Sequence, residues 1–197
     1  MSRFIESIKI QDGQIMNLEY HMSRFNNTRL CFFPGLQELE LGRWIHIPDE
    51  CGTGLFKCRI IYGEEIEKIE FIPYKQRVIT SLKLVFDNDI EYSFKYENRY
   101  ALNELWEQRE NNDDVIIVKH NLVTDSTYSN LVFLKEGIWY TPRHPLLKGT
   151  MRNKLVSQDL IKESDIHVDR ILEFEKIALI NAMIELGECL VDIHRIR

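Results

Sequence analysis

The sequence predicts an α+β protein built from two units. Most of the expected elements are short strands, and several pair around turns that contain glycine, which is typical of antiparallel sheets. Only a few longer stretches carry apolar residues at helical spacing. One segment, Pro73–Arg77, joins a proline to polar residues and predicts a short linker. We therefore expect a small α+β unit at residues 1–76 and a larger, strand-rich unit at residues 77–197.

The small unit is expected to begin with a strand and a helix. Alternating apolar residues predict a strand over Phe4–Ile10, which ends at the turn signal Asp12-Gly13. Apolar residues near helical spacing predict a helix over Asn17–Phe33, and Pro34-Gly35 terminates it. A second helix is expected over Leu36–Ile47, because the pattern continues until the next proline.

The remaining elements are mainly strands rich in β-branched and aromatic residues. Leu55–Tyr62 and Ile66–Ile72 are expected to form a hairpin around Gly63. In the larger unit we expect strands at Ser81–Phe86, Val115–Val118, Asn130–Leu134, Ile138–Thr141 and Lys176–Asn181, and helices at Lys95–Arg109 and Thr150–Ile161.

Composition limits the possible function classes. Of the 197 residues, 44% are hydrophobic and 28% are charged, which is typical of a folded globular protein. The formal net charge of −6 argues against a general binder of nucleic acid or of anionic membranes. The N-terminus lacks an apolar signal region and no apolar run is long enough to span a membrane, so the cytoplasm is the expected location. The cysteines Cys31, Cys51, Cys58 and Cys189 are expected to be reduced.

Taken singly, the polar residues that could carry chemistry have ordinary structural interpretations. Lys95 lies at the start of an expected helix, where a lysine is usually solvated. Asp125 lies in a loop of turn-forming residues and Arg59 lies within an expected strand. Gly149 precedes a helical pattern whose first backbone amides could hold a phosphate. The histidines show no metal-ligand spacing, and no P-loop, G-x-S-x-G or G-x-G-x-x-G motif is present.

Read in chain order, seven short motifs form a recognisable series. They are H-M-S-R at His21–Arg24, K-C-R-I-I-Y-G at Lys57–Gly63, K-Y-E-N-R at Lys95–Arg99, L-V-T-D-S-T-Y-S-N-L-V-F at Leu122–Phe133, Y-T-P-R at Tyr140–Arg143, K-G-T-M-R at Lys148–Arg152 and I-N-A-M at Ile180–Met183. The series resembles the class IV aminotransferases, the fold-type IV pyridoxal-phosphate (PLP) enzymes. Within that family it is most similar to the aminodeoxychorismate lyases. The resemblance covers nearly the whole chain and implies their two-domain α+β fold, with a small N-terminal domain.

The resemblance implies a role for two residues at the reacting end of the cofactor. Lys95 matches the lysine that binds PLP covalently, which makes it the expected catalytic residue. Asp125 matches the acidic residue that faces the pyridine nitrogen. The family usually has glutamate there, so this chain places the carboxylate one methylene closer to its backbone.

The resemblance also implies which residues bind the phosphate. Arg59 matches the arginine of the family's strand, with Lys57 as an alternative because the strand ends early. The segment after Gly149 implies phosphate contacts from the backbone amides of Thr150 and Met151, and the late strand implies further contacts from Asn181 and Ala182. His21 and Arg24 match a segment of the small domain and are interpreted as structural.

The same resemblance implies a small-molecule amine or amino acid as substrate and a homodimer, with no nucleic-acid or membrane partner. A lyase of this kind converts 4-amino-4-deoxychorismate into pyruvate and the folate precursor 4-aminobenzoate. The alternative is an aminotransferase acting on branched-chain or D-amino acids, because Tyr100 lies where branched-chain enzymes carry a tyrosine near the cofactor. A non-catalytic PLP-binding relative is a second alternative, motivated by Asp125 and by a small domain that is short for the family.

Overall fold

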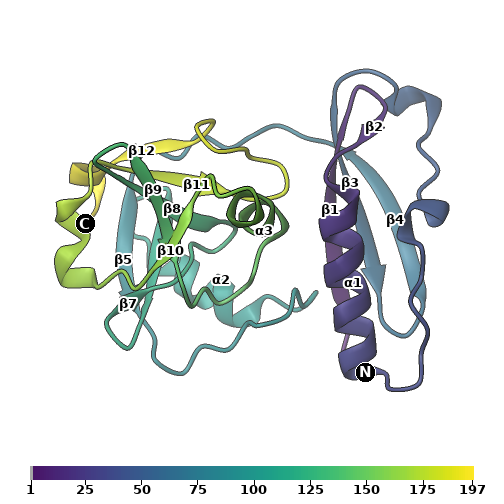
Figure 1. Ribbon diagram of the computed structural model, residues 1–197, viewed down its shortest axis with the longest axis horizontal. Coiled ribbons are helices and arrows are strands. Elements are labelled where there is room, and N and C mark those ends of the chain that lie inside the picture. Colours follow the sequence, from purple (N-terminus) through teal and green to yellow (C-terminus); the bar gives the residue numbers. More distant parts are fainter. Residues whose placement is uncertain (1) are drawn as a thin grey trace. The chain divides into compact units, whose positions relative to one another are not determined.

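The computed structural model describes residues 2–197 and divides the chain into two compact units (Figure 1). The first unit comprises Met1–Gln76 together with Phe94–Asn98, and the second comprises Arg77–Ser93 and Arg99–Arg197. The sequence had placed all residues after 76 in the second unit. The difference arises because Phe94–Asn98 returns to the first strand of the first unit and pairs with it.

The first unit is a four-stranded antiparallel sheet with one helix. The strands are β1 (Phe4–Gln11), β2 (Gln14–Ile15), β3 (Leu55–Tyr62) and β4 (Ile66–Pro73), in the order β2-β1-β3-β4. The helix α1 spans Leu18–Phe32. These elements confirm the predicted strand, helix and hairpin within one or two residues at each end.

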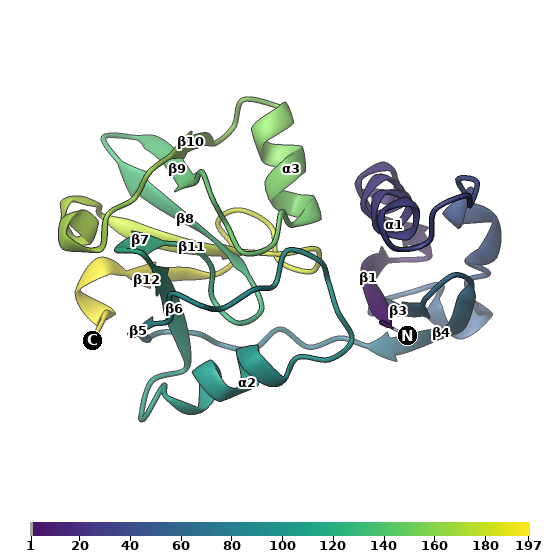
Figure 2. The same cartoon turned by 90° about the horizontal axis from the view of Figure 1, so that it is seen from below.

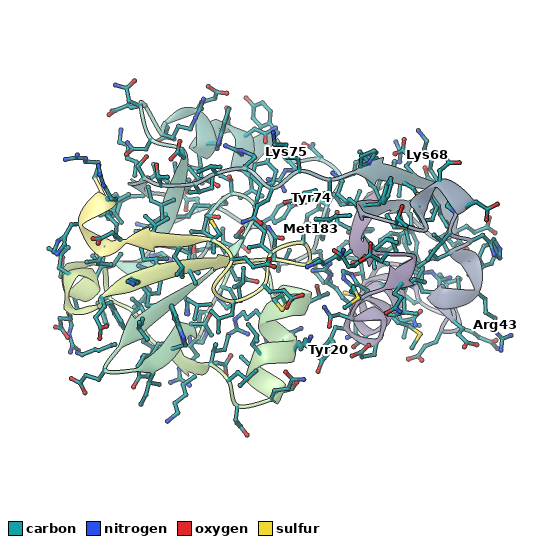
Figure 3. All side chains as sticks on the ribbon, turned by 90° about the horizontal axis from the view of Figure 1, so that it is seen from above. Tyr20, Arg43, Lys68, Tyr74, Lys75 and Met183 are labelled. Carbon is teal, nitrogen blue, oxygen red and sulfur yellow. The ribbon has the colours of Figure 1, made fainter. Side chains whose placement is uncertain are left out.

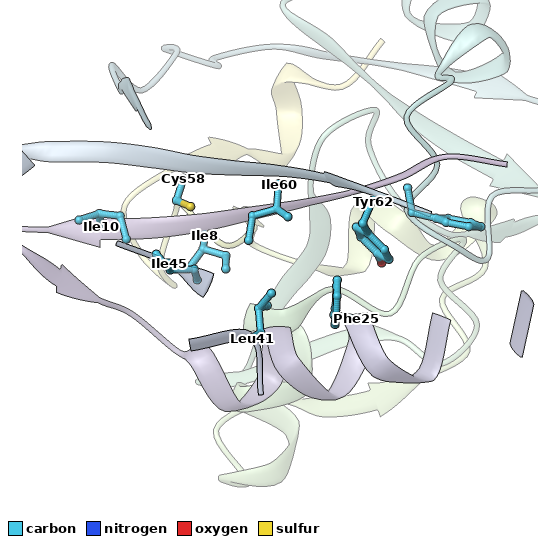
Figure 4. Packing of buried hydrophobic residues seen from close by; sticks show 9 residues of the cluster. Ile8, Ile10, Phe25, Leu41, Ile45, Cys58, Ile60 and Tyr62 are labelled. Atoms are coloured by element: carbon cyan, nitrogen blue, oxygen red, sulfur yellow. The ribbon is translucent and has the colours of Figure 1, made fainter. Parts of the chain in front are cut away.

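One face of this sheet and α1 enclose a hydrophobic core (Figure 4). The buried side chains that share this core come from alternate positions of β1 and β3, from α1 and from the following segment: Phe4, Ile8, Ile10, Phe25, Leu41, Ile45, Cys58, Ile60 and Tyr62. Because side chains alternate along a strand, Glu6 lies on the same face of β1 as Phe4 and Ile8. A charged side chain therefore points from the sheet toward the helix side.

The second helix predicted over Leu36–Ile47 is wrong. The structure has only two single-turn 3₁₀ helices in this region, η1 (Leu41–Trp44) and η2 (Asp49–Cys51). The Asn26 side chain donates to the Leu39 carbonyl at 3.0 Å and accepts from the Leu39 amide at 2.9 Å. These bonds occupy the backbone groups that a helix would use, so the apolar residues reach the core from irregular backbone.

The second unit holds two sheets. In the smaller sheet β5 (Leu82–Phe86) pairs in parallel with β6 (Asp114–Lys119), and β7 (Leu122–Val123) pairs antiparallel with β6. The larger sheet has the order β10-β9-β8-β11-β12. Its strands are β8 (Asn130–Lys135), β9 (Ile138–Pro142), β10 (Lys162–Ser164), β11 (Lys176–Ile180) and β12 (Leu190–Asp192), and two 3₁₀ turns follow β10 and β12, η3 (Val168–Glu173) and η4 (Ile193–Arg195).

Both helices of the second unit are shorter than predicted. The helix α2 spans Tyr100–Glu107 instead of beginning at Lys95, because the preceding residues pair with β1. The helix α3 spans Thr150–Ser157 (Figure 2). It packs on β8 and β11 through Met151 and Leu155. No helix within residues 2–197 is long and apolar enough to cross a membrane.

Candidate active site

Lys95 lies in an extended segment that pairs with β1. The Ile5 amide donates to the Lys95 carbonyl at 2.9 Å, and Tyr96 forms a β-bridge with Phe4. The rings of Phe4 and Tyr96 lie 5.2 Å apart, and Phe94 packs against Phe32 from α1. Rings on both sides of Lys95 are thus anchored in the core of the first unit, which fixes its backbone while its half-buried side chain remains partly accessible.

A buried ion cluster occupies the helix side of β1. Glu6 is fully buried and accepts two hydrogen bonds from Arg24, at 2.8 Å from Nε and 2.6 Å from Nη2. The second oxygen also lies 2.7 Å from Nδ1 of His21. Burial by itself would raise the pKa of Glu6, but the charge and hydrogen bonds of Arg24, with those of His21, lower it to about 2. Glu6 is therefore ionised at neutral pH.

The charge of Lys95 affects the pKa of His21 in this cluster. Burial lowers the pKa of His21, the hydrogen bond and charge of Glu6 raise it, and the positive charges of Arg24 and Lys95 lower it again, so that the pKa ends below its usual value. Sequence reasoning interpreted His21 and Arg24 as structural and gave Glu6 no role. The signal that could have found Glu6 is a carboxylate on the apolar side of a strand, between Phe4 and Ile8.

Arg59 is engaged by carboxylates in the structure. Its Nη1 lies 3.1 Å from Glu70 on the neighbouring strand, and its Nη2 lies 3.1 Å from Glu97, two residues after Lys95. The side chain is 26% exposed. Arg59 is thus linked through Glu97 to the segment that carries Lys95, and an incoming phosphate would compete with two acidic partners. Lys57, the alternative, lies opposite Lys9 in the sheet.

Asp125 is deeply buried in the second unit. It is 4% exposed, and its Oδ1 accepts from the Asn130 side chain at 2.7 Å while its Oδ2 accepts from the Leu147 amide at 2.9 Å. Burial raises the pKa of Asp125 to about 7, although these hydrogen bonds and the charge of Arg152 lower it. The carboxyl group is therefore poised between its two protonation states near neutral pH.

The helix α3 begins three residues after Leu147, whose amide donates to Asp125. Gly149 precedes the helix in extended conformation and provides no side-chain cap, so Thr150 and Met151 contribute the first backbone amides. Both residues are 2% exposed. Arg152 faces elsewhere and donates to the Pro142 carbonyl at 2.9 Å and to Glu163 at 2.5 Å. The amides of Thr150 and Met151 have the chemistry that an anion requires.

Asn181 holds the loop that carries Asp125. Its Nδ2 donates to the Tyr128 carbonyl at 3.2 Å and to the Ser129 hydroxyl at 3.0 Å, while its Oδ1 accepts from the Met183 amide at 2.8 Å. Met183 is labelled in Figure 3, in the turn after β11, and Ala182 lies in the same turn. The second unit thus links the predicted positions Asp125 and Asn181 through one loop and connects Asp125 to the segment before α3. Lys95 and Arg59 belong to the first unit.

These residues fit a group that carries a cationic ring nitrogen and a phosphate. The hydrogen bonds that residues 2–197 donate to Asp125 come from uncharged amides, so no cation is hydrogen-bonded to it there. With a pKa of about 7, the carboxyl group can ionise next to a protonated ring nitrogen. The amides at α3 suit a phosphate, and Lys95 supplies a primary amine. Across the described residues, no group of three or more His, Cys, Asp or Glu side chains could hold a metal ion.

The chain is similar to known proteins over most of its length. The model of the amino-transferase class IV family matches residues 65–189. A solved structure of a candidate 4-amino-4-deoxychorismate lyase from Haemophilus somnus is 36% identical, covers 94% of this chain and 98% of its own, and superposes with a TM-score of 0.89. An uncharacterized protein of Haemophilus influenzae is 34% identical over 93% of this chain and 98% of its own. A candidate aminodeoxychorismate lyase of Schizosaccharomyces pombe is 34% identical over 42% of this chain and 38% of its own. The predicted fold class is confirmed.

Proposed function

Because this chain belongs to the class IV aminotransferase family, a family of enzymes, we propose that it uses PLP to cleave 4-amino-4-deoxychorismate into 4-aminobenzoate and pyruvate. The main structural support for PLP as cofactor is the buried carboxyl group of Asp125, which accepts hydrogen bonds from two uncharged amides. One of these amides belongs to Leu147, three residues before α3 begins. The similarity to the Haemophilus somnus protein along nearly the whole of both chains favours the lyase reaction.

Asp125 would hold the protonated pyridine nitrogen of the cofactor, and the amides of Thr150 and Met151 would bind its phosphate. Arg59 is proposed to add charge to the phosphate site, and Asn181 and Ala182 to complete it. When bound, PLP supplies a ring that withdraws electrons from the carbon next to the substrate nitrogen. Asp125 sustains that property, because a carboxylate next to the ring nitrogen keeps the nitrogen protonated.

Lys95 is proposed to bind the cofactor through Nζ and, once released by the substrate amine, to move protons as base and acid. A lysine does this near neutral pH when neighbouring positive charge lowers its pKa. The positive charges of Arg24 and Lys95 both act on His21, and Glu6 pairs with Arg24. The cluster of Glu6, His21 and Arg24 is therefore proposed to set part of the electrostatic field around Lys95.

The reaction is tested with purified protein, PLP and 4-amino-4-deoxychorismate. We expect equal amounts of pyruvate and 4-aminobenzoate, measured by a coupled dehydrogenase assay and by fluorescence after chromatography. A Lys95→Ala protein is the control for non-enzymatic breakdown. Absence of pyruvate above this control contradicts the lyase.

Two other outcomes of the same preparation identify the alternatives. Conversion of the bound cofactor to its amine form by branched-chain or D-amino acids would identify an aminotransferase. A PLP spectrum without any turnover would identify a non-catalytic relative. Tyr100, which kept the aminotransferase alternative open, is the first residue of α2 and is 67% exposed in the structure.

The phosphate contact of Arg59 predicts a specific loss of affinity. Replacing Arg59 with alanine is expected to lower the preference for PLP over pyridoxal, which lacks the phosphate, roughly tenfold or more, as for other hydrogen bonds between charged groups. Dissociation constants from fluorescence titration measure this preference. Arg43→Ala is the matched control, because Arg43 is exposed and pairs with the exposed Glu40 at the surface.

An unchanged preference in Arg59→Ala would contradict the assignment. The guanidinium of Arg24 is the other candidate, because Glu6 holds it rigidly and both Arg24 and Lys95 act on His21. An Arg24→Lys protein keeps the charge but loses the two parallel hydrogen bonds. If Arg24→Lys loses the preference for PLP over pyridoxal and Arg59→Ala retains it, then Arg24 is the residue that binds the phosphate.

We also propose that the protein is a homodimer in the cytoplasm. Light scattering coupled to size-exclusion chromatography is expected to give twice the chain mass of 23.5 kDa. A mass equal to that of one chain would contradict the dimer.

A further inference from the structure

Asn130 closes a buried ring of hydrogen bonds around Asp125. Its Nδ2 donates to Asp125 Oδ1 at 2.7 Å and to the Leu147 carbonyl at 2.8 Å. The Leu147 amide donates to the other oxygen of Asp125 at 2.9 Å, so the three residues are joined pairwise. Asp125 and Asn130 are 4% and 6% exposed. A buried ring in which each member holds the other two is rigid.

The same amide side chain lies against the start of α3. A Cβ atom added at Gly149 would lie 2.1 Å from Asn130 Oδ1, closer than any two such atoms can approach. The backbone of Gly149, with φ −66° and ψ 151°, is accessible to any residue, so the space taken by Asn130 is what requires glycine here. Asn130 therefore contacts the segment that leads into the first amides of α3 as well as the carboxylate of Asp125.

We propose that Asn130 is a positioning residue that sets the separation between the Asp125 carboxylate and the α3 amides of Thr150 and Met151. This inference rests on the proposed PLP chemistry. The ring nitrogen and the phosphate belong to one nearly rigid molecule, so both ends bind at full strength only if their protein partners are already the right distance apart. The shorter Asp125 makes this more demanding, because aspartate has fewer rotatable bonds than glutamate with which to adjust.

The chemistry of an amide suits this position. Its NH₂ group can donate to two acceptors at once, and its oxygen can face the backbone of Gly149 without a charge. An aspartate at position 130 would place a second carboxylate against Asp125, and an alanine would leave Asp125 and the Leu147 carbonyl each without one donor. The group that fits must be a neutral donor of this size.

The test measures how strongly the two ends of the cofactor bind together. In the unaltered protein the ratio of dissociation constants, pyridoxal over PLP, reports what the phosphate adds. We expect Asn130→Ala to reduce this ratio at least tenfold, because the two ends no longer fit simultaneously. We expect amide hydrogen exchange at Leu147 in the cofactor-free protein to become at least tenfold faster.

Two further variants separate positioning from general loss of stability. Ile161→Val removes one methyl group from the core beneath α3 and is expected to leave both readouts unchanged. Asn130→Asp keeps the size of the side chain but sets a second carboxyl group against Asp125 in place of the donor, so it should reduce the ratio as well. Equal weakening of PLP and pyridoxal, with Leu147 exchange as in the unaltered protein, would overturn the proposal.

The same measurements distinguish a failure of the proposed function from a failure of the proposed role of Asn130. If the unaltered protein binds no PLP, the proposed function is wrong and the role of Asn130 toward the cofactor is wrong with it. If the unaltered protein binds PLP and Asn130→Ala retains the full ratio, only the positioning role is wrong.

Discussion

Replacing Lys95 with alanine is expected to abolish covalent attachment of PLP and to reduce turnover by roughly 10²–10⁴-fold through the loss of proton transfer alone. Alanine has neither the amine that would bind the cofactor nor a group that can carry a proton. The measurement is mass spectrometry of the intact chain after borohydride reduction, which fixes the cofactor to the lysine, together with pyruvate formation. In the unaltered protein we expect the added mass on the peptide that contains Lys95.

A matched control separates the amine from the fold around it. Lys162→Ala removes an exposed lysine from β10 and is expected to retain the attachment at Lys95. The phosphate and the ring nitrogen would still find their partners in Lys95→Ala, so non-covalent PLP binding is expected to persist in that variant. Covalent label elsewhere in the chain, with full turnover in Lys95→Ala, would contradict the assignment.

Replacing Glu6 with glutamine is expected to lower the free energy of unfolding by about 3–5 kcal/mol. The change removes the negative charge that compensates Arg24, and it leaves that guanidinium partly buried with a weaker acceptor. Denaturant unfolding followed by circular dichroism measures the loss. Glu67→Gln is the control, because Glu67 pairs with Arg3 at the surface and its loss is expected to cost less than about 1 kcal/mol.

The pH dependence of stability gives a second readout for the same cluster. The pKa of Glu6 falls from 4.5 to about 2 on folding, so its contribution is fully present above pH 4.5 and is lost as the pH falls toward 2. A shift of that size corresponds to about 3 kcal/mol. The unaltered protein should therefore lose about this much more stability than Glu6→Gln between pH 5 and pH 2. Parallel curves for the two proteins would contradict an ionised Glu6.

Local patterns in the sequence were sufficient to predict elements whose burial follows their own periodicity. Phe4–Gln11 alternates and forms a strand, and Leu18–Phe32 has helical spacing and forms a helix. The prediction failed at Leu36–Ile47, where the side chain of Asn26 takes the backbone bonds of Leu39. That competition joins residues 13 positions apart, so no window along the chain could reveal it.

In the candidate site too, local motifs predicted the residues, while contacts from distant parts of the chain set their properties. Motif order pointed to Lys95 and Asp125, but the partners that set their properties come from distant parts of the chain. Glu6 meets His21 and Arg24 across the strand–helix interface, and Leu147 reaches Asp125 over 22 positions. Burial, which raises the pKa of Asp125 to about 7, is a property of the packed unit and cannot be computed from the residues of the loop.

The return of Phe94–Asn98 to the first strand has a consequence for synthesis of the chain. The Ile5 amide donates to the Lys95 carbonyl and the Glu97 amide donates to the Arg3 carbonyl. During synthesis, Arg3 and Ile5 therefore remain without these partners until residues 90 or more positions later have been made. The ribosome has to synthesise Arg77–Ser93 of the second unit, and then Phe94–Asn98, before the first unit can complete its fold. A fragment ending at Gln76 would expose the aromatic surface of Phe4 and Phe32 that Phe94 and Tyr96 cover, and we expect it to aggregate.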